Sequence, residues 1–251
     1  MTVLGELQGR HVVVTGGGTG VGAEIAGRFA KAGAAVTIMG RSEESLQAQG
    51  LPYQICDVTE PDDVRAAFDA ARAERGAVTV VVANAGAVES APFAKMPPAA
   101  MQAMLAVNLT GVAQVWQAAL PDMQAAAWGR MIAIASTAGL KGYPYVSAYC
   151  AAKHGVVGLT RALALELAGD GITVNAICPG FIEAPMLERS VARIVEKTGM
   201  AEDEVLASLI EGNPQKRFIQ TDEVADTALW LCSDAARSVN GHALALSGGE
   251  V

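Results

Sequence analysis

A tyrosine and a lysine stand four residues apart in the stretch Ser147–Gly155 (SAYCAAKHG). Residues at positions i and i+4 share one face of a helix, so Lys153 would lie beside Tyr149. The pKa of a tyrosine side chain is ordinarily about 10, and a nearby ammonium group lowers it by favouring the phenolate. Such a pair can pass a proton to or from a substrate oxygen near neutral pH. The structural alternative is an ordinary helix that exposes two amphipathic side chains.

A second candidate is the glycine-rich stretch Thr15–Gly22 (TGGGTGVG). Glycines let the backbone approach a pyrophosphate closely, and the free N–H groups at the start of a helix then point at the anion. Tight turns between strands and helices also need glycine, so the cluster by itself is weak support. Its place after the first predicted strand and before the first predicted helix favours dinucleotide binding.

These residues are set in a regular alternation of short apolar runs and longer helical segments. The runs suit strands that are buried on both faces. The strands are predicted at His11–Thr15, Ala35–Met39, Tyr53–Cys56, Val78–Ala83, Arg130–Ala135, Ile172–Ile177 and His242–Leu246. The main helices are predicted at Val21–Ala32, Pro61–Arg75, Pro98–Ala127, Ala148–Ala168 and Thr221–Ser233. We expect Pro121 to kink or end the third helix, and Thr221 to be the N-cap of the last.

Alternation of this kind predicts an α/β fold: a Rossmann-type doubly wound domain with a seven-stranded, mostly parallel sheet and helices on both faces. No linker or shift in composition divides the chain, so we expect residues 1–251 to form a single dinucleotide-binding and catalytic domain. The segment from about 181 to 218 breaks the rhythm with two short amphipathic helices, Met186–Lys197 and Ala201–Glu211. Because it follows the carboxyl end of a parallel strand, we interpret it as a substrate lid.

Composition argues against several classes of protein. The formal net charge is −8 and the basic residues are scattered, which disfavours nucleic-acid binding. No apolar run approaches the ~20 residues that span a bilayer, so no membrane is expected. Residues Met1–Gly9 lack a basic region followed by an apolar one, so no signal peptide is expected. The four cysteines fit neither zinc nor redox spacing, which indicates free thiols in the cytoplasm and no metal.

Six motifs together resemble the short-chain dehydrogenase/reductase family, in the family's order and over essentially the whole chain. They are TGxxxGxG at Thr15–Gly22, ANAG at Ala83–Gly86, VNLTG at Val107–Gly111, IASTAG at Ile134–Gly139, YCAAK at Tyr149–Lys153 and CPG at Cys178–Gly180. Two departures are an alanine, Ala83, where the family usually has asparagine, and a short segment Arg41–Cys56, which we expect to trim one helix at the sheet edge.

The resemblance implies an NAD(P)-dependent oxidoreductase that interconverts a ketone and a secondary alcohol by hydride transfer. It implies that Tyr149 is the general acid and base, and that Lys153 lowers its pKa and binds the nicotinamide ribose. Ser136 would hold and polarise the substrate oxygen at the carboxyl edge of the sheet. Asn108 would distort the long helix and carry a water that relays protons to the lysine.

The resemblance also implies a set of cofactor contacts. Asp57 would accept a hydrogen bond from the adenine amino group, and Ile182 would offer a backbone amide to the nicotinamide carboxamide. The full set is Gly16, Gly18, Thr19, Gly20, Val21, Gly22, Arg41, Ser42, Asp57, Val58, Asn84, Ala85, Gly86, Tyr149, Lys153, Pro179, Gly180 and Ile182.

The choice between the two nicotinamide cofactors rests on the end of the second strand. An acid there would bind the ribose hydroxyls of NAD and repel a 2′-phosphate, yet no acid occurs before Glu43. Arg41 can pair with a 2′-phosphate, which favours NADP(H). Thr19 stands where many NADP enzymes have a basic residue, and an arginine stacked on adenine is compatible with NAD(H). NADP(H) is therefore the prediction and NAD(H) stays open.

Within the family the chain resembles 3-oxoacyl reductases, polyketide ketoreductases and 3-hydroxybutyrate dehydrogenases. Where the last group has polar residues for a free carboxylate, this chain has Val88, Ala138 and Ser147. We therefore expect a 3-oxoacyl or 3-hydroxyacyl thioester of coenzyme A or an acyl carrier, covered by the apolar lid residues Met186, Leu187 and Ile194. Basic residues that could meet coenzyme A phosphates are Lys95, Lys141, Arg189 and Arg193. The alternative substrate is a cyclic, aromatic or steroid alcohol.

Two functions of other classes remain as alternatives. A non-catalytic dinucleotide-sensing module could use the same fold, but it would not need Asn108, Ser136, Tyr149 and Lys153 together. A methyltransferase also opens with a glycine-rich turn, but the Tyr149–Lys153 pair serves no methyl transfer. Apolar stripes on Gly111–Ala119 and Val156–Leu167 exceed what one sheet face needs. By resemblance, these helices pair across a two-fold axis, which predicts a homotetramer.

Overall fold

The sheet is the frame that positions the candidate site. The structure, a computed structural model, describes residues 7–251, in which seven strands form one sheet in the order β3-β2-β1-β4-β5-β6-β7, with every neighbouring pair parallel. The strands are β1 (His11–Thr15), β2 (Ala35–Gly40), β3 (Tyr53–Ile55), β4 (Val78–Ala83), β5 (Gly129–Ile134), β6 (Ile172–Pro179) and β7 (Ala243–Leu246). The predicted fold class is confirmed. The expectation about a signal peptide concerns mainly residues 1–6, which lie outside the described part.

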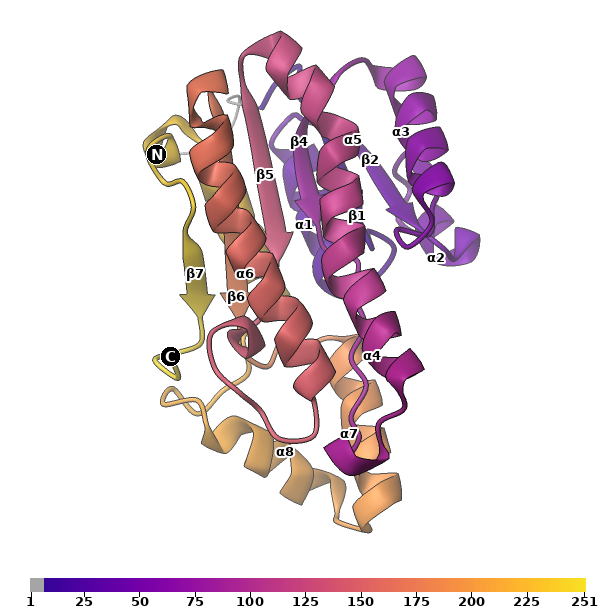
Figure 1. The fold of residues 1–251 in the computed structure, drawn as a ribbon, viewed down its shortest axis with the longest axis vertical. Coiled ribbons are helices and arrows are strands. Elements are labelled where there is room, and N and C mark those ends of the chain that lie inside the picture. Colours follow the sequence, from indigo (N-terminus) through magenta and orange to yellow (C-terminus); the bar gives the residue numbers. More distant parts are fainter. Residues whose placement is uncertain (1–6) are drawn as a thin grey trace.

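Helices cover both faces of this sheet, and Figure 1 shows α5 and α6 in front of it with α1 behind. One layer contains α3 (Pro61–Arg75), α5 (Gly111–Ala126) and α6 (Ser147–Leu167). The opposite layer contains α1 (Gly20–Lys31), the five-residue α2 (Glu43–Gln47) and α9 (Thr221–Leu231). Successive strand residues point to opposite faces, so both sets must be apolar. In β1, Val13 packs in the first layer, whereas Val12 and Val14 pack in the second.

The strand order reverses beside β1, which pairs with β2 on one side and with β4 on the other. The chain builds β2 and β3 outward from β1, and then crosses back to place β4 next to β1. The loops that follow β1 and β4 therefore leave in opposite directions and open a crevice at the carboxyl edge. Doubly wound sheets bind their ligands at such a switch point.

The long helix predicted at Pro98–Ala127 is divided in the structure. It consists of α4 (Pro98–Leu105), a π-helical turn (Ala106–Thr110) and α5. The expectation that Pro121 ends the helix early is wrong, because α5 continues to Ala126. Pro121 has no N–H for the carbonyl four residues earlier. Arg72 of α3 donates a hydrogen bond to the neighbouring carbonyl of Ala118 and so supplies a polar partner on that side of the helix.

This same stretch, Pro98–Ala126, is the one in the described residues that could cross a membrane by length and composition: it has 29 residues and contains an 18-residue window with a mean hydropathy of 1.2. The α5 part buries Val112, Trp116 and Ala119 against the sheet. Packing in the core therefore accounts for these apolar residues.

The segment predicted to be a lid forms α7 (Pro185–Thr198) and α8 (Glu202–Glu211) below the carboxyl edge (Figure 1). The two helices pack on each other through Leu187, Val191 and Val205. The predicted N-cap of α9 is wrong by one residue: Gln220 is the N-cap and Thr221 is the first helical residue. The side chain of Glu223 reaches back to the backbone N–H of Gln220 at 2.8 Å, which places the cap there.

Candidate functional site

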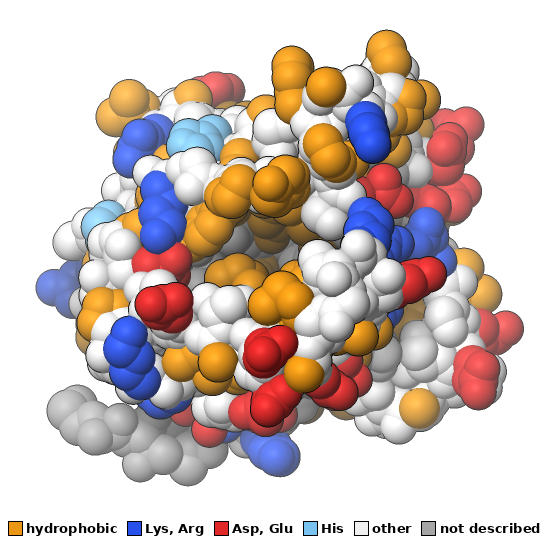
Figure 2. Space-filling model, turned by 90° about the horizontal axis from the view of Figure 1, so that it is seen from below, with side chains coloured by type: hydrophobic (Ala, Val, Ile, Leu, Met, Phe, Trp, Pro, Cys, Tyr) orange, Lys and Arg blue, Asp and Glu red, His pale blue; other side chains and the backbone are white. Residues whose placement is uncertain are grey.

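The candidate site lies at the carboxyl edge of the sheet. Figure 2 views the molecule from this end and shows a central hollow with hydrophobic side chains around much of its rim and charged side chains further out. Strands β1, β4, β5 and β6 all end here, between the glycine-rich loop and the lid helices (Figure 1). Residues from distant parts of the sequence therefore meet around one opening.

The glycine-rich loop is shaped for close approach of the backbone. Gly16 and Gly20 have φ of +65° and +54°, a region that other residues rarely adopt. A Cβ atom on Gly22 would lie 2.2 Å from the carbonyl oxygen of Gly16, so no larger residue fits there. Thr19 is the extended N-cap of α1 and has no side-chain hydrogen bond to the helix, which leaves the first-turn N–H groups for another acceptor. These features fit a pyrophosphate.

Thr15, which the sequence analysis did not single out, joins this loop to the one after β4. Its Oγ1 accepts hydrogen bonds from the backbone N–H groups of Asn84 and Ala85, each at 3.1 Å. The Asn84 side chain donates in return to the carbonyl oxygens of Thr15 (3.0 Å) and Gly16 (3.3 Å). The sequence signals for Thr15 were its place as the first residue of the TGxxxGxG motif and as a polar residue that ends a strand with three valines.

Two of the residues predicted to contact the adenine side of the cofactor, Arg41 at the end of β2 and Asp57 after β3, form an ion pair with each other. Arg41 is 80% exposed in its side chain and lies 3.8 Å from the carboxylate of Asp57. Partial burial raises the pKa of Asp57, but hydrogen bonds from Thr59 and the charge of Arg41 outweigh it and hold that pKa below its ordinary value. Ser42 caps α2 by accepting from the Ser45 N–H. Val58 is buried against Gly111.

The predicted proton-transfer residues come together on β5 and α6. Ser136 follows β5 in extended conformation, and its Oγ accepts from the N–H of Ala138 at 3.1 Å. Lys153 is buried and donates from Nζ to the carbonyl oxygen of Ile134 at 2.8 Å. The same Nζ lies 5.6 Å from the centre of the Tyr149 ring. Tyr149 and Lys153 thus share one face of α6, as the spacing predicted.

The protonation states differ from the sequence expectation. Burial raises the pKa of Tyr149 to about 12, while the side chain of Ser136 acts in the opposite direction. Burial also lowers the pKa of Lys153 to about 8. The ammonium therefore does not lower the pKa of Tyr149 below its ordinary value, because burial disfavours both charged forms. At neutral pH Tyr149 is a neutral phenol, the form that donates a proton.

Asn108 lies in the π-helical turn, where Gly111 N–H bonds to the carbonyl of Ala106 five residues earlier. The predicted distortion of the long helix at Asn108 is therefore present. Its side chain donates to the carbonyls of Met104 (3.0 Å) and Ala87 (2.8 Å), and accepts from the N–H of Ala87 at 3.2 Å. Asn108 thus holds the loop after β4, and its role in a proton relay stays a prediction.

After β6, the chain turns toward the lid. Gly180 donates its N–H to the carbonyl of Leu246 at 2.9 Å, which ties this turn to β7. Ile182 forms a parallel bridge with Ile219, using the carbonyl of Phe181 and the N–H of Glu183. The N–H of Ile182 takes no part in this bridge. It is therefore available for the predicted contact to the nicotinamide carboxamide.

Two residues that the sequence analysis missed lie close to this turn. The carboxylate of Glu250 accepts a hydrogen bond from Tyr143, 107 residues earlier in the chain. No local pattern signals such a pair.

In the described part of the chain, no group of three or more His, Cys, Asp or Glu side chains is placed to hold a metal ion.

Comparison with known proteins decides the family. Residues 16–250 match the family model described as enoyl-(acyl carrier protein) reductase. The chain belongs to the short-chain dehydrogenase/reductase family. As a member of this family it is an NAD(P)-dependent oxidoreductase of the type that interconverts a ketone and a secondary alcohol. Its seven-stranded sheet and glycine-rich loop are the family's dinucleotide-binding frame.

Similar members of the short-chain dehydrogenase/reductase family act on different compounds. The chain is 34% identical to D-β-hydroxybutyrate dehydrogenase of Rhizobium meliloti, over 96% of this chain and 98% of the relative. It is 38% identical to cis-4-hydroxycyclohexanecarboxylate dehydrogenase of Sinomonas cyclohexanicum, over 96% of each chain. The crystal structure of an actinorhodin polyketide ketoreductase variant with NADPH matches with a TM-score of 0.91 and 34% identity, over 96% of this chain and 97% of that one.

The lowered pKa of Lys153 gives a stability test. A lysine with a lowered folded-state pKa costs stability while it is charged. The full cost applies below about pH 8, where the folded and the unfolded protein are both protonated at Lys153. It falls between about pH 8 and pH 10.5, because the folded protein loses this proton there while the unfolded chain keeps it. We expect Lys153→Met to remove a cost of about 3 kcal/mol at pH 7, offset by about 1 kcal/mol for the lost hydrogen bond to Ile134.

The measurement is urea unfolding of the ligand-free protein between pH 7 and pH 10. The stability advantage of Lys153→Met over wild type should shrink as pH rises, whereas an exposed control, Lys197→Met, should show a difference that is small and constant. A Lys153→Met difference that does not change with pH would contradict the assignment of a buried ammonium group.

Proposed function

We propose that this enzyme reduces an uncharged ketone, best represented by a 3-oxoacyl thioester, to the secondary alcohol with NADPH. The observation that carries the proposal is the group formed by Ser136, Tyr149 and the buried Lys153, beside a loop shaped for a pyrophosphate. The balanced reaction consumes one ketone, one NADPH and one proton, and yields one alcohol and NADP⁺. In this proposal the cofactor contacts are those named from the family motifs.

Each side chain has a defined part in the reaction. The Ser136 hydroxyl donates a hydrogen bond to the substrate oxygen and stabilises its developing charge. Tyr149 then gives its phenolic proton to that oxygen. With a pKa of about 12, Tyr149 is still a far stronger acid than the alcohol that forms, so this transfer runs downhill. Lys153 stabilises the phenolate left behind. The reduced nicotinamide, when bound, supplies the hydride.

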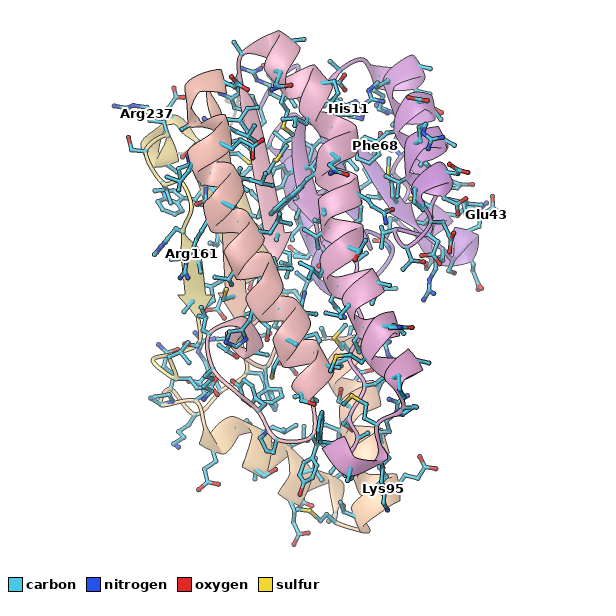
Figure 3. The ribbon with its side chains drawn as sticks, viewed as in Figure 1. His11, Glu43, Phe68, Lys95, Arg161 and Arg237 are labelled. Atoms are coloured by element: carbon cyan, nitrogen blue, oxygen red, sulfur yellow. The ribbon has the colours of Figure 1, made fainter. Side chains whose placement is uncertain are left out.

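The thioester assignment draws on the lid. Its helices pack on each other around Leu187, Val191 and Val205, while Met186 at the start of α7 is 38% exposed and can contact an acyl chain. Lys197 ties α7 to the loop after β4 by donating to the carbonyl of Ser90 at 3.1 Å. We propose that residues 181–218 cover the acyl chain within a single domain. Lys95, which Figure 3 shows at the lower end of the molecule near α7, is exposed and can meet a phosphate of coenzyme A. Lys141 is already paired with Glu250.

A second candidate is a cyclic ketone. Two large hydrophobic side chains, Phe93 and Tyr145, are 75% and 65% exposed, and the N–H of Ala91 donates to the carbonyl of Tyr145, which places their segments together. Tyr145 has a φ of +67°, an unusual conformation for a tyrosine. Exposed aromatic side chains on neighbouring segments suit an apolar ring substrate. The relative from Sinomonas is named for a cyclohexane derivative.

Oligomeric state and location are also proposals. Leu165 on α6 is 85% exposed, and this apolar residue supports pairing of α6 with a second copy in a homotetramer. Light scattering should give the mass of four chains, and a monomer in dilute solution would contradict the proposal. The four cysteines are free and buried, which supports a reducing, cytoplasmic environment.

The role of Tyr149 is tested by Tyr149→Phe. Loss of the phenolic proton should lower kcat for ketone reduction by about 10²–10⁴-fold, with folding and NADPH affinity retained. A matched control is Tyr53→Phe, which removes a hydroxyl at the edge of the sheet that bonds to Glu43. That control should keep wild-type kcat. Equal activity of wild type and Tyr149→Phe would refute the mechanism. If wild type bound NADPH but turned over no ketone, that result would favour the non-catalytic sensing module.

The substrate class and cofactor preference are tested on the wild type with a matrix of acetoacetyl-CoA, a substituted cyclohexanone and crotonyl-CoA, each with NADPH and NADH. We expect the highest kcat/KM for acetoacetyl-CoA with NADPH, because Arg41 can pair with the 2′-phosphate. Turnover of the cyclic ketone alone would select the second candidate. Reduction of crotonyl-CoA alone would indicate an enoyl reductase. A clear preference for NADH would contradict the role of Arg41.

A further inference from the structure

A buried carboxylate lies beside the candidate site and has no part in the proton transfer described above. The side chain of Glu250, the penultimate residue, is 6% exposed. Its Oε1 accepts hydrogen bonds from Lys141 Nζ at 2.7 Å and from the Tyr143 hydroxyl at 2.6 Å. The Lys141 side chain, 37% exposed, also lies with Nζ 4.9 Å from the centre of the Tyr143 ring. A buried charge this close to a substrate pocket requires a reason.

The hydrogen bonds connect this carboxylate to the residue next to Ser136. Tyr143 has a single hydroxyl proton, and the ionised carboxylate of Glu250 can only accept, so Tyr143 donates to Glu250. The 2.7 Å contact between the Thr137 and Tyr143 hydroxyls must then be a donation from Thr137. Burial, followed by the bond to Glu250, raises the pKa of Tyr143 and keeps its proton in place. Glu250 is therefore two hydrogen bonds from the backbone that carries Ser136.

Glycines on two further segments lie against the carboxylate. A Cβ atom on Gly180, at the turn after β6, would lie 3.3 Å from Glu250 Oε2. A Cβ atom on Gly212, which ends α8, would lie 3.4 Å from Oε1. The Tyr143 ring meets Phe181 edge to face at 6.2 Å. Glu250 thus lies where the loop after β5, the turn after β6 and the end of α8 converge, at the carboxyl edge of the sheet beside the candidate site.

We propose that Glu250 is a specificity-determining residue, whose carboxylate neutralises Lys141 and so leaves the substrate wall without net positive charge. The enzyme then selects uncharged ketones over ketones that carry a free carboxylate near the carbonyl. This inference rests on the proposed ketone reduction at the same site. Two relatives are named for hydroxy acids, which carry a free carboxylate. In this proposal the enzyme differs from them in disfavouring a substrate with a free carboxylate.

The physical basis is the range of the electrostatic interaction. An ion pair acts on its surroundings as a short-range dipole, whereas an unpaired charge acts across a pocket that holds little water. With Glu250 ionised, Lys141 offers no net attraction to an anionic substrate. Without that negative charge, Lys141 would attract a carboxylate, and without Lys141 the buried carboxylate would repel one.

The test measures kcat/KM for acetoacetate and for its uncharged methyl ester, with NADPH, in four forms of the protein: wild type, Glu250→Gln, Lys141→Met and the double variant. The ratio of the two kcat/KM values is the readout. We expect Glu250→Gln to raise the acetoacetate-to-ester ratio on the order of tenfold, the effect of one unit charge about 10 Å away at an effective dielectric constant of about 20. Lys141→Met should lower the ratio, and the double variant should restore the wild-type value.

The ratio distinguishes an effect of charge on substrate choice from a loss of folded protein, because a less stable variant loses activity on both ketones alike. Tyr143→Phe is the matched control: it removes the hydrogen bond to Glu250 without changing the charge, so the ratio should stay at the wild-type value even if kcat falls. Added salt should reduce the gain of Glu250→Gln. An unchanged ratio in Glu250→Gln, or the same rise in Tyr143→Phe, would overturn the proposal. If wild type turned over neither of these ketones nor acetoacetyl-CoA, that result would instead refute the proposed function, and this inference with it.

Discussion

The buried ammonium group of Lys153 is the constraint on which the rest of the site depends. Burial makes the charge costly, and the carbonyl of Ile134 at the end of β5 is the partner that keeps it in place. That contact fixes α6 against the carboxyl edge of the sheet, and with it the position of Tyr149 opposite Ser136. The same burial keeps Tyr149 neutral. One interaction between a helix and a strand end thus sets both the geometry and the protonation of the candidate proton donor.

The cofactor side of the site depends on a separate set of hydrogen bonds that join loops from distant parts of the chain. Thr15 holds Asn84, whose side chain returns to the glycine-rich loop, and Asn108 holds Ala87 from the π-helical turn. The chain crosses the sheet between β3 and β4, so these loops become neighbours only at the switch point. The glycines of the loop have no side chains with which to hold it in place. Thr15 and the loop after β4 provide these contacts.

Much of the fold could be predicted because local patterns carry it. Strands buried on both faces need continuous apolar runs, and the predicted strands agree with the observed ones to within about two residues. One error arose where contacts between elements outweigh local preference. Pro121 does not end its helix: α5 continues to Ala126, and its Val115 and Ala119 pack in the core against the sheet. The error at α9 is a local one: the cap lies at Gln220, because the side chain of Glu223, three residues later in the same helix, accepts from its N–H.

The sequence by itself determined the fold class, the family motifs and the shared helix face of Tyr149 and Lys153, since helical periodicity and the alternation of strands and helices are local properties. Only the tertiary structure decided the protonation of that pair, because a pKa depends on burial, and burial depends on every element packed around the group. The tertiary structure likewise brought Glu250 to Tyr143 across 107 residues. No spacing along the chain encodes that contact, because it exists only where the end of the chain folds back over the carboxyl edge of the sheet.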